Sequence, residues 1–532
     1  MILRLVEKYA CLLWLVPALL LWAAFPPLAE KVDALFALAP LLWLVRRPGA
    51  MRRVVIIWFL NGFCFWLATL SWMPAIVKNG GPWPLVALGL VALSAYCALY
   101  FAAYGFLAKS MWDFVCGRSY WFRLFAVVVV EPVLWAGLEI VRSRFLGGFA
   151  WNQLGTVAVN AGFGAPAAFG GVYILSMVIV LINGTITGVA ERIFRKGGTA
   201  LETLLPLVIV YALYSFSGED VAMRWKRYFN GEERKVALVQ RNFPCVFDES
   251  AAENPDEVYS NLLANVSLLM PDLVVLPESA MAEFGRVNGA NAHIFAENVR
   301  RQTGATEVIA GGTRVERGDN WLPKVYNSAA LYTEDRTLFY DKVHLVPFGE
   351  FIPFDKTFPA LQRLAPVGSC WPGELKLLGD YGVAICYEDT DSAQIRRLAE
   401  KGARALVFIT NDSWFGGSHE AVQHAWQSTA RAIETGLAVV RVGNSGVTGV
   451  IAPDGAATWL ENSHSRPLTD MRGTMFDRIF LAPKDGKSAL APYVTLGDKP
   501  IFIVFSLFIL AGFMIKYLKP IRKTKVEEDG IE

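Results

Sequence analysis

The sequence predicts two structural parts, a multi-span α-helical membrane domain and an α/β domain outside the membrane. The chain has 532 residues, of which 54% are hydrophobic and only 18% are charged, unlike an ordinary soluble protein. The apolar residues are concentrated near the ends of the chain, in Ala10–Phe216 and Ile501–Ile515. Between them, in Ser217–Pro500, short apolar runs alternate with stretches of helical spacing, a pattern typical of a layered α/β domain.

Eight apolar runs are long enough, or nearly so, to cross a hydrocarbon core of about 30 Å, which takes about 20 helical residues. Seven of them precede the α/β domain and one follows it. Their ranges are 9–28, 32–46, 53–74, 83–108, 122–141, 166–190, 200–217 and 499–518, and the second is the shortest. No small-residue cleavage site stands out after the first run, so we interpret it as a membrane span and not as a cleaved signal peptide.

Basic residues between the spans predict the side of each loop. With eight spans, the clusters within Arg46–Arg53, Lys109–Arg123, Arg192–Lys196 and Lys516–Lys525 all fall on one side, which is the cytoplasm by the positive-inside rule. The α/β domain then faces outward. The net charge of +2 averages over both compartments and indicates no nucleic-acid partner.

These observations divide the chain into four predicted segments. They are a seven-helix membrane domain over 1–217, an outward α/β domain over 218–498, an eighth membrane helix over 499–518 and a charged cytoplasmic tail over 519–532.

Apolar alternation and helical spacing predict the elements of the outward domain in order. We expect strands at 235–240, 273–276 and 307–312, a hairpin of 326–332 with 337–340, strands at 383–385 and 405–410, and a second hairpin of 438–442 with 449–451. We expect helices at 255–269, 292–303, 392–401 and 423–436. The segment is long enough to enclose one large core.

Three of the predicted strands end in residues with reactive side chains, namely Glu278, Lys342 and Cys386. A thiol at a strand end can project from a sheet edge, where a substrate can reach it. It needs a base or a nearby cation to become a nucleophile. A carboxylate in an apolar setting suits the role of base, and an ammonium can favour the thiolate and stabilise an oxyanion. Each residue alone has an ordinary structural interpretation, but their order and flanking residues together favour catalysis.

Glu, Lys and Cys at strand ends in this order resemble the nitrilase superfamily, in which these groups carry out amide and acyl chemistry. The resemblance implies a nitrilase-like αββα sandwich. It also implies that Glu278 is the general base, Lys342 the electrophilic stabiliser and Cys386 the nucleophile. The backbone N–H of Tyr387 would then be a second donor to the oxyanion.

With the membrane spans included, the chain resembles the apolipoprotein N-acyltransferase family of the bacterial inner membrane over essentially its whole length. The segments that carry the resemblance are Tyr340–Pro353, Ala384–Glu388, Asn411–Gly416, Gln423–His424, Arg431–Gly436, Arg441, Asn444–Gly446 and the membrane-domain loop Gly148–Gly155. Two positions depart from the family pattern. Ala150 stands in the place of a proline, and the stretch after the first strand lacks the usual tryptophan, for which Phe247 is the candidate replacement.

The family resemblance implies supporting or substrate-binding residues and a reaction. The residues are Glu350, Tyr387, Glu388, Asn411, Trp414 and Phe415. Cys386 would take an acyl chain from a phospholipid as a thioester and pass it to the N-terminal α-amine of the diacylglyceryl-cysteine of an apolipoprotein. The enzyme would be a multi-pass protein of the bacterial inner membrane with its catalytic domain in the periplasm. No metal or organic cofactor is implied.

Both lipid substrates reside in the bilayer, so apolar loops should reach it. The candidates are Phe348, Phe351, Ile352, Phe354, Trp321–Pro323 and Trp414–Phe415. We expect a structural role for His344, and a disulfide between Cys245 and Cys370 stays open.

Two other function classes stay open at this point. A membrane-anchored amidase acting on a soluble substrate would keep the three residues but would not need the Gly148–Gly155 loop or apolar loops around the site. A receptor or transporter with a degenerate domain should have lost one of the three residues, and this chain keeps them all.

Overall fold

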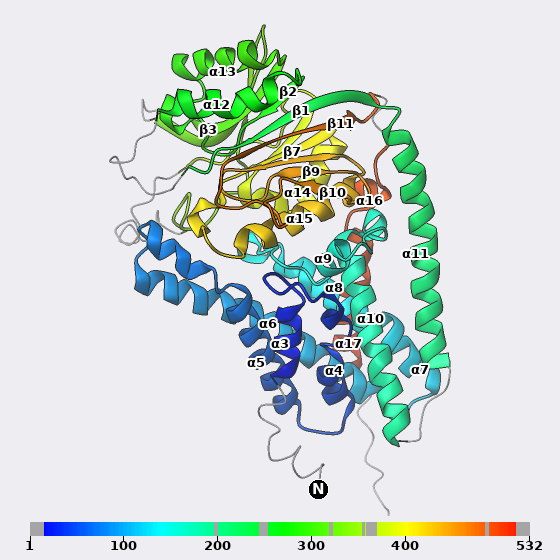
Figure 1. The fold of residues 1–532 in the computed structure, drawn as a ribbon. Coiled ribbons are helices and arrows are strands. Elements are labelled where there is room, and N and C mark those ends of the chain that lie inside the picture. The colour runs from blue at the N-terminus through cyan, green and yellow to red at the C-terminus, as the bar shows by residue number, and fades with distance from the viewer. Residues whose placement is uncertain are drawn as a thin grey trace, which may run out of the picture.

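A computed structural model describes residues 15–195, 201–243, 254–318, 323–353, 357, 370–484 and 489–517. A bundle of helices lies below a two-sheet α/β domain, and the chain enters and leaves that domain through helices (Figure 1). This arrangement confirms the predicted fold class.

Helices make up the lower part of the molecule. They are α3 (Val16–Ala23), η1 (Lys31–Leu35), α4 (Ala39–Arg46), α5 (Met51–Thr69), η2 (Met73–Asn79), α6 (Trp83–Val115), α7 (Tyr120–Phe125), α8 (Glu131–Arg142), α9 (Gly155–Asn160), α10 (Ala167–Arg195), α11 (Leu201–Tyr228) and α17 (Lys499–Tyr517). In the part of the chain that is described, five helical segments are long and apolar enough to cross a membrane: Met51–Asn79, Trp83–Val115, Tyr120–Arg142, Ala167–Phe194 and Thr203–Tyr228. A shorter apolar helix covers Lys499–Met514.

The predicted second span, 32–46, is broken into η1 and α4. Eight helical residues rise only about 12 Å, so α4 alone is shorter than the hydrocarbon core. The break is stabilised because the Asn183 side chain of α10 accepts the backbone N–H groups of Leu38 and Ala39, at 2.8 and 3.0 Å. Backbone polar groups that water cannot reach need such partners.

The predicted first and seventh spans also differ from the observed helices. The described part of the first span is α3, which ends at Ala23, and residues 9–14 lie outside the described ranges. Helix α11 continues past the predicted end at 217 to Tyr228, because Trp225 and Tyr228 pack against the core of the α/β domain. The count of eight spans and the four segment boundaries stay predictions.

The α/β domain contains two sheets. The strands are β1 (Glu232–Gln240), β2 (Leu273–Val275), β3 (Glu307–Arg317), β4 (Pro323–Tyr332), β5 (Thr337–Asp341), β6 (Tyr381–Ile385), β7 (Ala405–Thr410), β8 (Val439–Gly443), β9 (Gly449–Ile451), β10 (Ala457–Trp459) and β11 (Gly473–Leu481). One sheet has the order β11-β1-β2-β3-β4-β5 and the other β10-β9-β8-β7-β6. The predicted hairpins are β4–β5 and β8–β9. Strands β10 and β11 were not predicted from the sequence. Strand β11 pairs antiparallel with β1 from Glu232 to Gln240.

Two helices cover the outer face of each sheet, which makes an αββα sandwich (Figure 1). They are α12 (Pro255–Ser267) and α13 (Ala290–Thr303) on the first sheet, and α14 (Ser392–Glu400) and α15 (Glu420–Thr435) on the second. Alternate residues of a strand point to opposite faces. In β6, Val383 and Ile385 therefore pack between the sheets while Ala384 packs against the helices.

Helix α15 lies between the second sheet and the membrane domain (Figure 1). Almost every residue of this helix is buried, including charged ones. The membrane domain therefore covers what would otherwise be the outer face of the sandwich.

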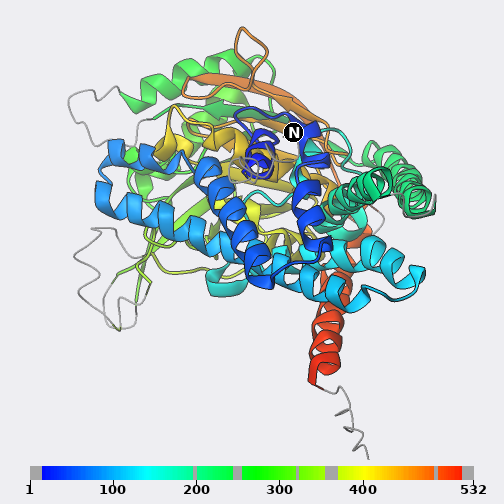
Figure 2. The ribbon, with the colours of Figure 1, turned by 90° about the horizontal axis from the view of Figure 1, so that it is seen from below.

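Helix α17 lies at the edge of the bundle when it is viewed from below (Figure 2) and packs against α8 through a glycine. A Cβ atom built on Gly137 would lie 2.2 Å from ring carbons of Phe505, which is buried. On the same helix as Phe505, a Cβ built on Gly512 meets no heavy atom within 4 Å.

We expect Gly137→Leu to force α17 away from α8 and to destabilise the protein by about 1–3 kcal/mol, as overpacking of a close contact does. Gly512→Leu is the matched control and should be neutral or slightly stabilising, because leucine favours a helix more than glycine. The measurement is the thermal unfolding midpoint of the detergent-solubilised protein. Equal midpoints for the two variants would contradict the α8–α17 contact.

Candidate active site

The three predicted reactive residues come together where strands of both sheets end. In the first sheet β2 is parallel to β3, β4 is antiparallel to β3, and β5 is antiparallel to β4, so β2 and β5 point the same way. Glu278 and Lys342 therefore follow strands that end at one edge of that sheet. Cys386 follows β6 of the second sheet. Lys342 is 1% and Glu278 is 7% exposed, and the charges of both act on the Cys386 thiol.

A chain of polar contacts joins the glutamate to the lysine. The Asn327 side chain of β4 donates to Glu278 Oε1 at 2.7 Å and to Glu350 Oε1 at 2.6 Å. Lys342 Nζ donates to the same oxygen of Glu350 at 3.0 Å. The structure thus places Glu350 beside the lysine, where the family resemblance put it. Asn327 was not predicted from the sequence, because polar residues such as Lys324 and Ser328 also occur in this strand and do not single it out.

Burial raises the pKa of the Glu278 carboxyl, and the nearby negative charge of Glu350 raises it further. The ammonium of Lys342 and the hydrogen bond from Asn327 act in the opposite direction without cancelling these effects. A carboxyl group whose pKa is raised toward neutrality holds a proton more readily and is therefore a better general base.

Lys342 stays protonated in spite of its burial. Desolvation by itself would lower the pKa of its ammonium, but the negative charge of Glu350, with smaller contributions from Cys386 and Glu278, holds that pKa above the ordinary lysine range. The site therefore contains a permanent positive charge that cannot be lost by titration near neutral pH.

The nucleophile candidate stands at a sharp turn. Cys386 has a φ of +54°, in the left-handed region that non-glycine residues seldom occupy, and it begins the short helix η8 (Cys386–Thr390). Burial raises the pKa of the Cys386 thiol well above its usual value, the charge of Glu278 raises it further, and Lys342 lowers it. The thiol is consequently neutral at rest, and its reaction requires a base.

Glu388 is completely buried and holds the turn of Cys386 to the segment after Lys342. It accepts the backbone N–H of Val343 at 2.7 Å, of His344 at 3.0 Å and of Ile385 at 2.9 Å. The Gln394 amide and the Tyr340 hydroxyl also donate to it. Its side chain is used entirely within the protein, which favours a positioning role over contact with substrate.

Tyr387 connects the nucleophile turn to the membrane domain. Its ring lies almost parallel to those of Phe149 and Trp151, at interplanar angles of 16° and 9°. Its hydroxyl accepts the N–H of Ala150 at 3.3 Å and donates to the carbonyl of Gly148 at 3.4 Å. The loop singled out in the sequence, Gly148–Gly155, therefore lies directly against the residue that follows Cys386.

The loop after β7 also contacts the membrane domain. Asn411 accepts from the Ser413 hydroxyl at 2.6 Å and from Asn444 at 3.0 Å, and this orders the short helix η9 (Asp412–Phe415). Phe415 packs edge-on against Trp72, with ring centroids 4.7 Å apart. Trp414 is 43% exposed.

The other predicted lipid contacts have mixed outcomes. Phe348 is 62% exposed, as expected, but Ile352 is buried, so the prediction for that residue is wrong. His344 packs edge-on against Tyr387, which agrees with a structural role. Among the described residues Cys370 forms no disulfide. Five predicted residues lie outside the described ranges: Cys245, Phe247, Trp321, Leu322 and Phe354.

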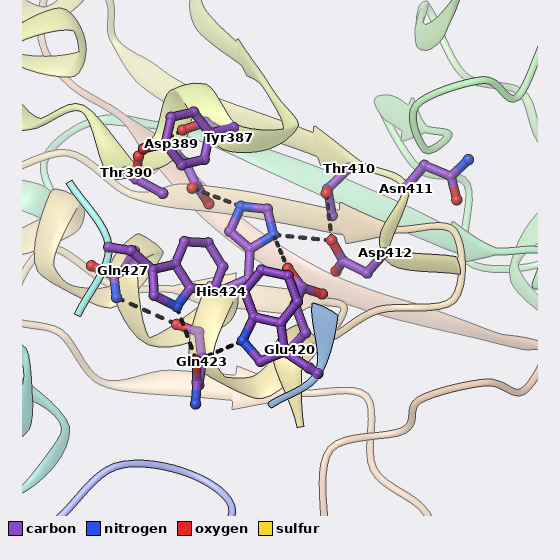
Figure 3. A network of polar contacts seen from close by, with 12 residues as sticks. Tyr387, Asp389, Thr390, Thr410, Asn411, Asp412, Glu420, Gln423, His424 and Gln427 are labelled. Atoms are coloured by element: carbon purple, nitrogen blue, oxygen red, sulfur yellow. Dashed lines mark hydrogen bonds and ion pairs between the residues drawn. The ribbon is translucent and has the colours of Figure 1, made fainter. Parts of the chain in front are cut away.

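A buried ionic network lies behind the nucleophile turn (Figure 3). His424 of α15 contacts Asp389 through Nε2 and Asp412 through Nδ1, both at 2.9 Å. The Arg441 guanidinium lies 2.5 Å from Asp389 and 3.5 Å from Asp412. The sequence had marked His424 and Arg441 only as residues of a resembling segment, and their role appears only in the fold.

The same network contains the one group of possible metal ligands within the described ranges, Asp412, Glu420 and His424. Both ring nitrogens of His424 already have carboxylate partners, and Arg441 contacts both aspartates. Although burial disfavours the imidazolium, the two aspartates outweigh it and raise the pKa of His424 to about 10. The positive charges of His424 and Arg441 thus balance the negative charges of Asp389 and Asp412. We interpret the network as a support for the turn that begins at Cys386.

We expect the pH profile of Cys386 alkylation to shift in opposite directions in two variants. Glu278→Gln removes a negative charge that raises the thiol pKa, so the profile should move to lower pH. Lys342→Met removes a positive charge that lowers the thiol pKa, so it should move to higher pH. The measurement is the iodoacetamide rate at Cys386 as a function of pH, with Cys386→Ala as the background. Shifts of the same sign would contradict the geometry described above.

Two family models match this chain. Residues 17–185 match the apolipoprotein N-acyltransferase N-terminal domain, and residues 235–463 match the carbon-nitrogen hydrolase model. Similar curated proteins are each named apolipoprotein N-acyltransferase. The protein of Geobacter metallireducens is 31% identical over 81% of this chain and 83% of its own length. That of Photobacterium profundum is 28% identical over 92% of both chains, and that of Haemophilus influenzae is 26% identical over 96% of both.

The two matches agree with the two parts of the fold, since the first covers the helices from α3 into α10 and the second covers the sandwich that carries Glu278, Lys342 and Cys386. The matches to the similar proteins extend over both parts, since they cover 81–96% of this chain. The chain belongs to the apolipoprotein N-acyltransferase family.

Proposed function

We propose that this protein transfers a fatty acyl chain from a membrane phospholipid, through a thioester on Cys386, to the N-terminal α-amine of the diacylglyceryl-cysteine of apolipoproteins. The observation that carries the proposal is the contact of Tyr387, next to the nucleophile, with Phe149 and Trp151 of the membrane domain. A site joined in this way to a membrane loop suits substrates that reside in the bilayer. The relatives' shared name supports the same reaction.

In the first step Glu278 takes the proton of the Cys386 thiol as sulfur attacks the ester carbonyl of the phospholipid. The oxyanion that forms is stabilised by the Lys342 ammonium and the backbone N–H of Tyr387. The carbon–oxygen bond then breaks, and Glu278 returns the proton to the leaving alkoxide. The products are a lysophospholipid and an acyl thioester on Cys386.

In the second step the α-amine of the apolipoprotein attacks the thioester carbonyl. Glu278 takes a proton from the amine, the same two donors stabilise the oxyanion, and the carbon–sulfur bond breaks. The proton returns to Cys386, and the product is an amide. Water must be kept from the thioester meanwhile, because its attack would turn the transferase into a phospholipase.

The proposed setting is the bacterial inner membrane, with the sandwich on the periplasmic side and phospholipid and diacylglyceryl apolipoproteins as substrates. The alternative, a membrane-anchored amidase for a soluble substrate, has no use for a loop of the membrane domain packed against Tyr387. That contact favours the acyltransferase.

We expect purified protein incubated with phospholipid to gain the mass of one fatty acyl group on Cys386 and to lose it in neutral hydroxylamine, which cleaves thioesters. Intact-mass spectrometry followed by peptide mapping measures this. Cys386→Ala should show no adduct, and Cys370→Ala should acylate like the unmodified protein. An adduct on Cys370, or a hydroxylamine-resistant one, would refute the proposed intermediate.

The same assay separates the two assisting residues. Glu278→Gln should slow both acylation and transfer to a diacylated lipopeptide by about 10²–10⁴-fold, the usual contribution of general acid–base catalysis. Lys342→Met should slow both by about 10²–10³-fold, as the loss of an oxyanion donor does. Lys342→Arg should restore little, because a planar guanidinium cannot replace a compact ammonium. Near-normal rates in Lys342→Met would eliminate this mechanism.

The membrane orientation has its own test. Reporter fusions after Gly49, Gly197 and the C-terminus should be cytoplasmic, and one after Asn230, just beyond the end of α11, should be periplasmic. The activities of paired alkaline phosphatase and green fluorescent protein fusions report the side at each point. A cytoplasmic signal after Asn230 would overturn the orientation.

A further inference from the structure

One buried side chain joins three segments of the membrane domain to the catalytic sandwich. Gln423 lies in the first turn of α15 and is completely buried. Its Nε2 donates to the carbonyl of Pro26, after α3, at 2.8 Å and to that of Thr69, at the end of α5, at 3.3 Å. Its Oε1 accepts the indole N–H of Trp151 at 2.9 Å and of Trp72 at 3.2 Å.

These contacts use the whole hydrogen-bonding capacity of the amide. The Asn152 side chain shares the same oxygen as a third and longer contact, at 3.3 Å. Figure 3 shows Gln423 below His424, with an indole ring on either side of it. Neighbouring residues of α15 thus face different partners, since His424 contacts the nucleophile turn and Gln423 contacts the membrane loops.

Each of the two indoles that Gln423 contacts packs against an aromatic side chain near the candidate site. The Trp151 ring is parallel to Tyr387, next to Cys386, with ring centroids 6.5 Å apart. The Trp72 ring packs against Phe415, in the loop expected to meet lipid. The position of both rings relative to the thiol therefore depends on one amide group.

Side chains of α8 in the membrane domain also contact the Gly148–Gly155 loop, which contains Trp151. Arg142 at the end of α8 donates to the carbonyls of Phe149 and Trp151, at 2.8 and 2.9 Å. Glu139, one turn earlier in α8, accepts the backbone N–H of Leu154 at 2.9 Å. Side chains of α8 on one side and the Gln423 amide of α15 on the other thus hold this loop against Tyr387, the residue after Cys386.

We infer that Gln423 is a positioning residue for the lipid substrate: it holds Trp151 and Trp72 where the acyl chains of the donor lie when the ester reaches Cys386. This inference rests on the proposed function. Gln423 contacts none of Glu278, Lys342 and Cys386 through a hydrogen bond recorded for the described residues, so its loss should affect lipid donors far more than small ones.

The experiment compares two acyl donors in the full-length protein in detergent. One is p-nitrophenyl butyrate, a small ester whose attack by Cys386 releases p-nitrophenol, and the other is a dipalmitoyl phospholipid in mixed micelles. Gln423→Leu keeps the side-chain volume and removes all of the hydrogen bonds. We expect it to lower the ratio of kcat/KM for phospholipid to kcat/KM for the small ester by about 10- to 100-fold, as a displaced substrate-positioning group does.

The control is Gln240→Leu. Gln240 is also completely buried and hydrogen-bonded, to Leu468, Met471 and Thr448, but all of these partners lie within the sandwich. Its replacement removes a comparable set of contacts away from the membrane loops, so the ratio should stay as in the unmodified protein. If Gln423→Leu does not fold, Trp72→Phe, which removes one donor to Gln423 and keeps a ring against Phe415, should lower the ratio in the same direction.

Equal losses for both donors in Gln423→Leu and in Trp72→Phe would overturn the inference, and so would an unchanged ratio. The outcome is separate from that of the proposed function. If the unmodified protein formed no thioester from phospholipid, the acyltransferase proposal would fail, whatever the effect of the variants on the small ester.

Discussion

The arrangement of this site depends on one buried carboxylate, Glu388, which takes hydrogen bonds from strand ends of both sheets. Its partners include the N–H groups of Val343 and His344, just after the lysine, and of Ile385, just before the cysteine. A buried charge is tolerated only when donors replace the water it has lost, and here the protein supplies them all. The same contacts that stabilise the carboxylate set the position of Lys342 relative to Cys386.

The electrostatics of the site follow from this close packing. Lys342 and Glu350 form an ion pair. The other two groups, the Glu278 carboxyl and the Cys386 thiol, each have a raised pKa. Two anions in this buried space would repel one another, so the thiol keeps its proton until a substrate carbonyl can take up the developing charge. In the proposed mechanism the lysine remains charged throughout and is available to the oxyanion.

Helix α15 relates this site to the membrane. A helix at the outer face of a sandwich normally turns polar residues to water, but here they are buried against protein on two sides. His424 and Arg431 contact the segment Asp389–Thr390 of the nucleophile turn. Gln423 and Glu434 contact the membrane domain, and Glu434 accepts the N–H of Val172 at the kink of α10. Polar side chains of α15 thus connect the membrane domain on one side to the turn that contains the thiol on the other.

The sequence by itself determined the fold class, most of the strands and helices, and the three reactive residues, because each depends on local signals. Apolar run length indicates membrane spans, alternation indicates strands, and an abrupt change from apolar to reactive residues marks a strand end. Glu350 came only from the family resemblance, in the segment that also contains Lys342. Local sequence signals could not distinguish one continuous span at 32–46 from two short helices. The break between these helices is stabilised by the Asn183 side chain of α10, which is distant in sequence.

Only the tertiary structure decided which polar residues surround Glu278, Lys342 and Cys386. No local pattern distinguishes a buried asparagine, histidine or glutamine, such as Asn327, His424 and Gln423, from an exposed one. Their partners come from other strands, from the second sheet and from the membrane loops, so their roles exist only once those segments meet. Composition and periodicity report how each segment packs, whereas hydrogen bonds between distant segments depend on their final positions.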